Sequence, residues 1–560
     1  MPGRRSSALY LGLDSSTQSL SAVVIEARGE DRRVVLETSL VFDELLPRYG
    51  THHGVLPRTD PHVACSSPLM WAEALDVMMA RLSKSGLDMT RLVAISGSAQ
   101  QHGSVYLNAE AASRLPALDP ARPLVGQIAS MLSRQVAPIW MDASTAVQCR
   151  EIATAVGGDH VLAQRTGSRA FERFTGPQIR KFFTQEPAGY AATDRIHLVS
   201  SFLASLLAGQ HSPLDPGDAS GMNLMDLATT AWWTPALDAT APGLASKLPA
   251  VVPAWTVAGA LAPYWRTRYG LPAAKVIVWS GDNPCSLVGV GLVREGRVAI
   301  SLGTSDTIFG LMKEPRVDAG GTGHVFGAPT GDYMGLTCFS NGSLARERVR
   351  DAYSLTWADF SAALESTPPG NHGRILLPWF EPEITPPVTQ PGVHRYGLSP
   401  DDAPGNVRAV VEAQQMAMAL HSRWMSVAID TIHATGGAAV NPAILQVMAD
   451  VFGAEVRRFD VSNSAALGAA LRAVHADGVA EGRPLSWDDV IGGLAQPAAG
   501  RLTPDARRHA IYREFMIAYE ACEAHARGRG ADPALALEQF RKVADDRPLS
   551  GPKPAAVQRF

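Results

Sequence analysis

The sequence has little excess charge and no long apolar run. Its 50 lysines and arginines nearly balance its 54 aspartates and glutamates, which gives a net charge of −4 over 560 residues. This balance argues against a basic face that binds nucleic acid. No segment approaches the roughly 18 uncharged apolar residues of a membrane span. The first apolar run breaks at Asp14 and Ser15, so the amino terminus does not resemble a secretory signal. We expect neither nucleic acid nor a membrane as a partner.

Cysteine is also scarce. The five cysteines are scattered, with neither a CxxC pair nor Cys/His spacing: Cys65, Cys149, Cys285, Cys338 and Cys522. This pattern excludes the usual zinc motifs and is typical of a reducing cytosol. We therefore expect a cytoplasmic protein, long enough for a large core and for more than one domain. No sequence feature specifies an oligomeric state.

What the chain does have is the alternation of strands and helices that is typical of an α/β fold. "LYLGLDSST" (9–17) is an apolar strand that ends in a carboxylate and a hydroxyl-rich turn; further strands and a helix over 67–86 follow. "RVAISLGTSD" (297–306) starts the same order again, with a helix over 343–353. The two starts predict a duplicated unit in which a strand delivers a hydroxyl-rich turn.

The last third of the chain reads as mostly helical. The apolar spacing over 406–437 predicts a long amphipathic helix that ends at the pair Gly436-Gly437. Two more helices are expected over 441–453 and 463–476. From 481 onward the composition predicts a tail with one helix, and the Pro-rich residues 547–560 predict a flexible end.

An aspartate interrupts an otherwise apolar run in "VWSGDNPCSLVGVGL" (278–292). An unpaired buried charge costs several kcal/mol, roughly, so Asp282 needs a reason to be there. It could cap the helix that follows, because Asp accepts backbone N–H bonds at a helix start. It could equally be a catalytic carboxylate, and the local sequence leaves both open.

Two short turns are rich in hydroxyl and backbone N–H groups, "DSSTQS" (14–19) and "GTSD" (303–306). Successive N–H groups in a tight turn bind anions, so the turns could hold phosphate, although either could be an ordinary hairpin loop. Asp14 at a strand end suits a hard cation such as Mg²⁺.

Other polar groups could bind a ligand. Gln100, Gln101 and His102 follow a buried strand and offer the donors and acceptors that suit a polyhydroxylated ligand. Arg169 could contact hydroxyls or phosphate, or could be a solvated surface residue. The glycine pair at 436–437 could end a helix or could let a flat adenine ring approach the backbone.

Taken together, these segments resemble the FGGY carbohydrate kinases. The resemblance runs from about residue 8 to about 480 and rests on "LGLDSSTQS", "SGSAQQHGS", "DASGMNLMDL", "SGDN", "ISLGTSD", "FSNGSLARE" and "GG…N…VMADVFGAEVRRFDVSNSAALGAALRA". The pattern is most similar to the branch that phosphorylates xylulose, and "QQHG" separates it from the glycerol kinases, which have an Arg-Glu pair in that loop.

The resemblance implies two actin-like ATPase domains of ribonuclease H-like topology with a cleft between them. It places an N-terminal domain that binds sugar and phosphate at 1–285, a C-terminal ATP-binding domain at 286–480 and the tail at 481–560. It also implies ATP-dependent phosphorylation of D-xylulose to D-xylulose 5-phosphate, with Mg²⁺ as cofactor.

The resemblance assigns roles to individual residues. Asp282 is the implied general base for the C5 hydroxyl, and Asp14 with Asp282 positions Mg²⁺ through water. The implied sugar contacts are His102, Gln101, Arg169, Asn283, Asp142 and Asp282. The implied phosphate contacts are Ser16, Thr17, Gly303 and Thr304. Gly436, Gly437, Asn441 and Trp357 are the implied adenine contacts.

Two positions depart from the family pattern. The seventh residue after Asp14 is usually basic and reaches the transferring phosphate, but here it is Ser21; either another cation substitutes or turnover is slow. The loop around Asp142 lacks the arginine of the bacterial pattern, so the match to the family is incomplete at that aspartate. The alternatives are a kinase for another ketose or polyol, such as ribulose or glycerol, and a weakly active sensor of sugar and nucleotide.

Overall fold

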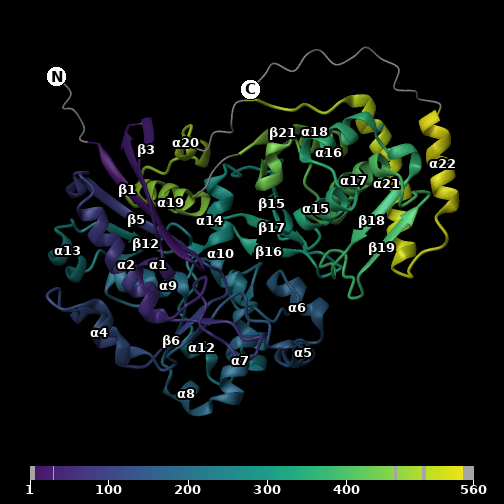
Figure 1. The fold of residues 1–560 in the computed structure, drawn as a ribbon. Helices are drawn as coiled ribbons and strands as arrows, with labels where there is room; N and C mark the ends of the chain where they lie inside the picture. Colours follow the sequence, from purple (N-terminus) through teal and green to yellow (C-terminus); the bar gives the residue numbers. More distant parts are fainter. Residues whose placement is uncertain (1–6, 30, 460–462, 495–499, 546–560) are drawn as a thin grey trace, which may run out of the picture. The chain divides into compact units, whose positions relative to one another are not determined.

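In a computed structural model, which describes residues 7–29, 31–459, 463–494 and 500–545, the chain forms two large sheets with helices packed on them (Figure 1). It divides into two compact units. The first comprises residues 1–295, 309–336 and 461–496, and the second comprises 296–308, 337–460 and 497–560. Among the described residues, no helix combines the length and apolar character needed to cross a membrane.

The first sheet has seven strands. Its order is β11 (Val257–Ala260), β12 (Lys275–Ile277), β5 (Leu92–Ala99), β1 (Ala8–Ser15), β2 (Ser19–Arg28) and β3 (Asp31–Val41), and β13 (Ser280–Gly281) also pairs with β5. β1 pairs antiparallel with β2 and parallel with β5. β5 therefore lies between β1 and the short strand β13, which is also parallel to it.

The second sheet has six strands. Its order is β16 (His324–Gly327), β17 (Tyr333–Phe339), β15 (Asp306–Met312), β14 (Arg297–Leu302), β20 (Thr431–Thr435) and β21 (Glu455–Arg458). β14 and β20 are parallel, and so are β20 and β21. The order β17-β15-β14-β20-β21 repeats β3-β2-β1-β5-β12, and this repetition confirms the predicted duplication and the predicted fold class.

In the part of the chain that the structure describes, four short ladders complete the strands: β4 (Cys65–Ser66) with β7 (Ala137–Pro138), β6 (Ser104–Leu107) with β8 (Arg195–Leu198), β9 (Met225–Asp226) with β10 (Ala231–Trp232), and β18 (Ile375–Trp379) with β19 (Gly392–Tyr396).

Most helices of the described residues belong to the first unit. They are α1 (Phe42–Leu45), α2 (Pro68–Ser83), α3 (Ala111–Arg114), α4 (Leu124–Ile128), α5 (Ala146–Ala155), α6 (Asp159–Thr166), α7 (Thr175–Gln185), α8 (Pro187–Ala192), α9 (Val199–Ala208), α10 (Pro216–Ala219), α11 (Thr234–Thr240), α12 (Leu244–Lys247), α13 (Pro263–Tyr269), α14 (Asp282–Gly289), α19 (Ser464–Ala480) and α20 (Trp487–Ile491). The second unit contains α15 (Ser343–Ala352), α16 (Trp357–Ser366), α17 (Ala403–His421), α18 (Pro442–Phe452), α21 (Ala506–Ala526) and α22 (Ala534–Asp545).

Alternate residues of β1 face two different cores. Leu9, Leu11 and Leu13 are buried with α2 in one apolar cluster, whereas Tyr10 is buried with α19 in another. Gly12 lies on the α19 side, where an added Cβ would stand 2.1 Å from the carbonyl oxygen of Ala466. β1 is therefore almost wholly apolar because helices cover both of its faces.

Two predictions for the last third were wrong. The helix expected over 406–437 is α17, which ends at His421, and Thr431–Thr435 is strand β20. β-branched residues and parallel pairing with β14 make the later part a strand. The tail contains α20, α21 and α22 rather than one helix. The predicted flexible end, 547–560, lies outside the described residues.

Candidate functional site

Two carboxylates lie at the same end of the first sheet. Asp14 is near the end of β1, opposite Ser98 of the parallel neighbour β5. Asp282 follows β13 directly, and Ser280 of β13 also pairs with Ser98. Because β1 and β13 run parallel to β5 on its two sides, their carboxyl ends bring Asp14 and Asp282 to one edge.

Asp282 is not the helix cap. Gly281 occupies the N-cap position of α14 and Asp282 is the first helical residue, so that alternative was wrong. Its Oδ1 accepts hydrogen bonds from the backbone N–H (2.9 Å) and the Nδ2 (3.2 Å) of Asn283. Burial, followed by the charge of Asp14, raises the pKa of Asp282 to about 7. The carboxylate is therefore a base of near-neutral strength.

Asp14 lies beside this group. Burial raises its pKa to about 6, and the Ser98 hydroxyl opposes that rise. Its Oδ1 is buried without a hydrogen-bond partner among the described residues. Buried polar atoms are rarely left this way, so this edge has free acceptor capacity for a ligand or hydrated ion.

The Gln-Gln-His loop after β5 is fastened to α14 and α10. The Nδ2 of Asn283 donates to Gln101 Oε1 (2.8 Å), and the Nε2 of Gln101 donates to the carbonyl oxygen of Gly217 (3.3 Å). His102 Nδ1 lies 2.7 Å from the carbonyl oxygen of Gly221. The structure thus brings Gln101, His102, Asn283 and Asp282 together.

His102 is held neutral in one tautomer. Burial and the charge of Arg173 lower the pKa of His102 to about 3. Because its only hydrogen-bond partner at Nδ1 is a carbonyl oxygen, Nδ1 carries the proton, and Nε2 is an acceptor. The ring packs against Phe174, with centroids 4.6 Å apart. A fixed acceptor of this kind suits a hydroxyl donor.

Arg169 is not the solvated surface residue of the alternative interpretation. Its guanidinium lies over the ring of Phe171, 4.6 Å from the centroid, and its Nε is buried without a hydrogen-bond partner among the described residues. This arrangement leaves a cation with spare donors on an aromatic surface.

Sequence reasoning missed an aromatic cluster beside these residues. His324 of β16 is buried against Phe171 and Phe326, and its Nδ1 lies 3.1 Å from Ser168 Oγ. No sequence signal marked His324, because it is about 150 residues from Phe171 and sits in an unremarkable strand.

Asp142 uses its oxygens to bond its own loop, α7 and the chain near residue 64. Oδ1 accepts hydrogen bonds from the backbone N–H of Ser144 (3.0 Å), the Ser144 hydroxyl and the Nε2 of Gln178 (2.8 Å), and Oδ2 accepts one from the N–H of Ala64 (3.1 Å). These bonds suit a carboxylate that shapes the loop. Its sugar contact stays a prediction.

Ser16 and Thr17 lie in the turn between β1 and β2. The turn is closed by Ser16 N–H donating to the carbonyl oxygen of Ser19 (2.9 Å). Trp140, which sequence analysis overlooked, is 43% exposed and donates its Nε1 proton to Thr17 Oγ1 (2.8 Å). Ser21 stands opposite Asp14 on β2, where its hydroxyl lies 2.8 Å from the Ser39 hydroxyl.

In the second unit, Gly303 and Thr304 form the turn between β14 and β15. An added Cβ at Gly342 would lie within 2.7 Å of the carbonyl oxygens of both, and Ser343 N–H donates to Gly303 O (2.7 Å). The start of α15 therefore packs directly on the turn.

A buried ion pair supports this turn from within. Arg346 donates to both carboxylate oxygens of Asp306 (2.9 and 3.2 Å), and both side chains are at most 2% exposed. Gln414 bridges Arg346 and the carbonyl oxygens of Asn341 and Gly342. Asp306 thus stabilises the turn through its ion pair with Arg346, and both of its carboxylate oxygens are used in that pair.

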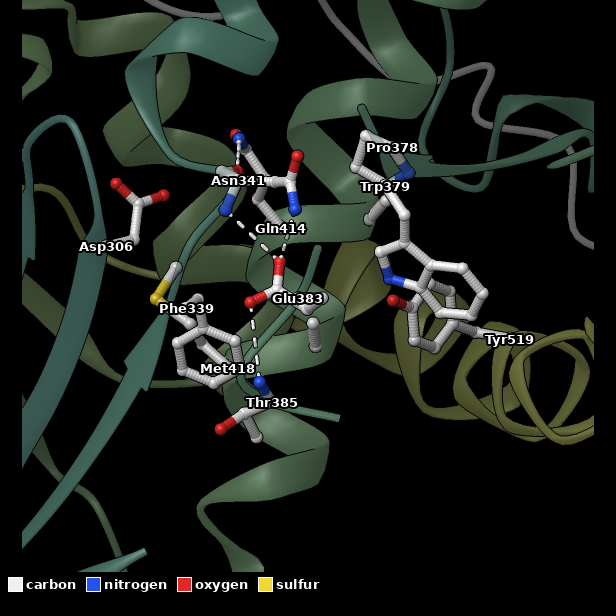
Figure 2. Close-up of a pocket in the computed structure, with 12 residues that line it drawn as sticks. Asp306, Phe339, Asn341, Pro378, Trp379, Glu383, Thr385, Gln414, Met418 and Tyr519 are labelled. Carbon is white, nitrogen blue, oxygen red and sulfur yellow. Dashed lines mark hydrogen bonds between the residues drawn. The ribbon is translucent and has the colours of Figure 1, made fainter. Parts of the chain in front are cut away.

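The same polar layer continues into a small cavity (Figure 2). Glu383 stands at its centre and accepts hydrogen bonds from Asn341 and from the N–H of Ser340 and Ile384. The space of about 20 Å³ holds little more than one water molecule. It is an interior cavity and too small for a nucleotide.

The glycine pair follows strand β20, not a helix, so the helix-end alternative was wrong. Gly436 has φ 88° and ψ 172°, a conformation that only glycine adopts readily, and an added Cβ would lie 2.6 Å from Leu302 O. An added Cβ at Gly437 meets no atom within 4 Å. Gly436 therefore packs against β14, and Gly437 faces open space.

Asn441 and Trp357 lie on neighbouring helices. Asn441 caps α18 by accepting the N–H groups of Ala443 and Ile444, and its Nδ2 donates to Ser361 of α16 (2.8 Å). Trp357, at the start of α16, is 43% exposed, with the Arg350 guanidinium 4.6 Å from its ring centroid. An exposed indole is a suitable surface for a flat ring to stack on.

Known proteins resemble this chain over most of its length. The family models described as the N-terminal and C-terminal domains of the FGGY family of carbohydrate kinases match residues 129–289 and 298–476. The xylulose kinase of Mus musculus is 42% identical over 525 residues, which cover 92% of this chain and 93% of that protein. Xylulose kinase 2 of Arabidopsis thaliana is 42% identical over 494 residues, 84% and 87% of the two chains.

The fold is also found among solved structures. The crystal structure of xylulose kinase from Rhodospirillum rubrum superimposes with a TM-score of 0.77 at 20% identity, over 93% of this chain and 99% of that one. Sequence and fold lead to one conclusion: this chain is a member of the FGGY family of carbohydrate kinases.

Proposed function

We propose that this chain transfers the terminal phosphoryl group of ATP to D-xylulose and forms D-xylulose 5-phosphate. The xylulose kinases at 42% identity, matched over more than four-fifths of this chain, support this substrate. The observation that carries the chemistry is the pair Asp14 and Asp282, whose positions at one end of parallel strands put a near-neutral base beside a second carboxylate.

Asp282 is the proposed general base. It takes the proton of the C5 hydroxyl, the resulting oxygen attacks the terminal phosphorus of ATP, and the bond from that phosphorus to the bridging oxygen of ADP breaks. A base with a pKa of about 7 is about half ionised near neutral pH, and its ionised form is basic enough to receive the proton.

The sugar is held by groups with fixed hydrogen-bonding character. His102 Nε2 accepts from a hydroxyl, whereas the amides of Gln101 and Asn283, linked to each other, both accept and donate. Arg169 supplies charged donors. Such a mixture matches the several hydroxyl groups and the single carbonyl oxygen of a ketose.

Asp14, with Asp282, is the proposed anchor for Mg²⁺. The Oδ1 of Asp14, which has no hydrogen-bond partner among the described residues, fits an ion that keeps its water and binds one or two carboxylates. When bound, Mg²⁺ neutralises charge on the phosphate oxygens of ATP. The turns at Ser16-Thr17 and Gly303-Thr304 are the proposed phosphate contacts.

The nucleotide base is proposed to lie against the second unit. Trp357 offers an exposed aromatic face, and Gly437 leaves the backbone uncovered. Gly436 and Asn441 hold that surface in shape through Leu302 and Ser361.

A coupled assay of ADP release across a panel of sugars tests the substrate. We expect D-xylulose to give the highest kcat/KM, with ribulose and glycerol well below it. A different sugar at the top would replace the substrate, and ATP hydrolysis that needs no sugar would refute the kinase.

Asp282→Asn tests the base, because the amide keeps the shape of the carboxylate and cannot accept the proton. We expect transfer to fall by about 10²–10⁴-fold, while D-xylulose still raises the melting temperature of the variant. Full activity in Asp282→Asn would remove Asp282 from the mechanism.

A second candidate function is that of a weakly active sensor. Ser21 favours it, because a hydroxyl stands opposite Asp14 where the family usually has a cation. A sugar that raises the melting temperature of the protein without ADP release would support the sensor.

A further inference from the structure

We propose that Arg472, a buried arginine on α19, is the positioning residue that holds Asp282 in place for catalysis. The inference rests on the proposed role of Asp282 as the base. It adds a residue about 190 positions away in the sequence that touches neither sugar nor nucleotide.

The guanidinium of Arg472 binds the ends of the strands that lead to the site. Its Nη1 donates to Gly97 O of β5 (3.2 Å), and its Nη2 donates to Val278 O (3.0 Å) and Ala254 O (3.1 Å). Gly97 immediately precedes Ser98, the partner of both Asp14 and Ser280. One side chain therefore ties β5, the strand that lies between β1 and β13, to Val278, two residues before β13 begins.

A second set of contacts reaches the residues next to Asp282. Arg472 Nη2 lies 3.1 Å from Asp215 Oδ2, and Asp215 Oδ1 accepts a hydrogen bond from Ser280 Oγ (2.9 Å), two residues before Asp282. Arg472 Nη1 also lies 3.5 Å from the Sγ of Cys285, three residues after Asp282 on the same helix. The start of α14 is thus held on both sides of the catalytic residue.

Close helix packing brings Arg472 to this point. An added Cβ at Gly289 of α14 would lie 1.9 Å from Ser464 O, and one at Gly468 of α19 would lie 1.9 Å from Cys285 O. Arg472 follows Gly468 by one helical turn and lies on the same face of α19. Figure 1 shows α19 across β1 and β5, beside α14.

The energetics indicate geometry rather than stability as the reason for the pair. Arg472 and Asp215 are at most 1% exposed, and burying two charges costs much of what their attraction returns. Burial raises the pKa of Asp215, and the charge of Arg472 opposes that rise. An apolar pair would fill the same volume at a lower desolvation cost. It could not hydrogen-bond to the three carbonyl oxygens that Arg472 holds or to the Ser280 hydroxyl that Asp215 holds.

Arg472→Met and Arg472→Lys test the proposal. Methionine keeps most of the volume and loses every hydrogen bond, so we expect kcat to fall about 100-fold, with the KM for xylulose and for ATP nearly unchanged. Lysine keeps the charge and some donors, so Arg472→Lys should recover part of kcat.

Arg408→Met is the matched control. Arg408 is also a buried arginine, bound to Glu412 (2.7 Å), to Leu364 O (3.0 Å) and to the Tyr512 hydroxyl in the second unit. We expect both methionine variants to lower the melting temperature, but only Arg472→Met to lower kcat. If kcat of Arg472→Met matches that of Arg408→Met at a temperature where both are folded, the proposal is wrong.

Ser280→Ala keeps the proposal testable if Arg472→Met fails to fold. It removes one hydroxyl from the link between Asp215 and the strand before Asp282, and we expect a lower kcat at unchanged KM. An unchanged kcat would show that the hydrogen bond between Ser280 and Asp215 does not position Asp282, and it would overturn the proposal. Activity in Asp282→Asn would instead refute the proposed base, so the two failures are distinguishable.

Discussion

At the scale of single residues, the acid strength of Asp282 makes a direct prediction. Burial and the charge of Asp14 raise the pKa of Asp282 to about 7, and a general base works only when it is ionised. Activity should therefore be lost as pH falls through the folded-state pKa, and retained above it. His102 stays neutral across this range because its pKa is lowered to about 3.

We expect kcat/KM for xylulose to have an acid limb with a midpoint about pH 7, because kcat/KM reports the ionisation of the free enzyme. A pH–rate profile in a constant-ionic-strength buffer measures it. A midpoint near pH 4, typical of an unperturbed carboxyl group, would contradict the assignment.

Ser21 makes a second prediction at this scale. It faces Asp14 across the β1–β2 pair and is buried, so a lysine there would place a cation beside the developing charge. We expect Ser21→Lys to raise kcat by about 10-fold, or roughly 1.4 kcal/mol of transition-state stabilisation.

Ser21→Met is the control for Ser21→Lys, because methionine adds similar bulk without charge. Steady-state kinetics of both variants decide the point. If lysine gives no more activity than methionine, another basic residue already supplies the charge.

At the scale of elements, the two adjacent glycines that follow β20 have different surroundings. Gly436 has a backbone conformation that a side chain strains, with Leu302 O in the way, whereas Gly437 has free space around it. We expect Gly436→Ala to destabilise the second unit by roughly 1–3 kcal/mol. Gly437→Ala should leave stability unchanged.

The same pair tests the proposed adenine surface. A methyl group at Gly437 occupies the space that the base would use, so we expect a several-fold higher KM for ATP and an unchanged KM for xylulose. Calorimetry and steady-state kinetics on both variants measure this. An unchanged KM for ATP in Gly437→Ala would place the base elsewhere.

At the scale of the whole molecule, the C-terminal helices belong to the second unit. Phe540 of α22 is 3% exposed and packs on Phe515 of α21, with ring centroids 4.7 Å apart. An added Cβ at Gly370 would lie 2.5 Å from its ring. Helices α21 and α22 therefore contribute to the core of the second unit.

We expect Phe540→Ala to lower the free energy of unfolding by about 3–5 kcal/mol with little change in either KM. Leu535→Ala is the control on the same helix, because Leu535 is 66% exposed and its loss should cost less than about 0.5 kcal/mol. Equal effects of the two substitutions would refute the packing role of α22.

Local pattern was enough to predict the strand that ends at Asp14, the turn at Gly303 and Thr304, and the duplicated unit. In each, apolar residues precede a small-residue turn within about ten positions, so the signal is contained in one stretch of chain. The same pattern failed for Thr431–Thr435, which was assigned to a helix, because pairing with β14 outweighed the apolar spacing.

The sequence by itself determined the family, the two strands that each end in a hydroxyl-rich turn and the residue types available for phosphoryl transfer, because these depend on neighbouring residues. Only the tertiary structure decided that Asp282 follows a cap rather than forming one, that Ser21 faces Asp14, and that Arg472 reaches the strand ends from α19. Sheet register sets Ser21 opposite Asp14, and close helix packing brings Arg472 to strands that are far from it in the chain. No local pattern encodes either relation.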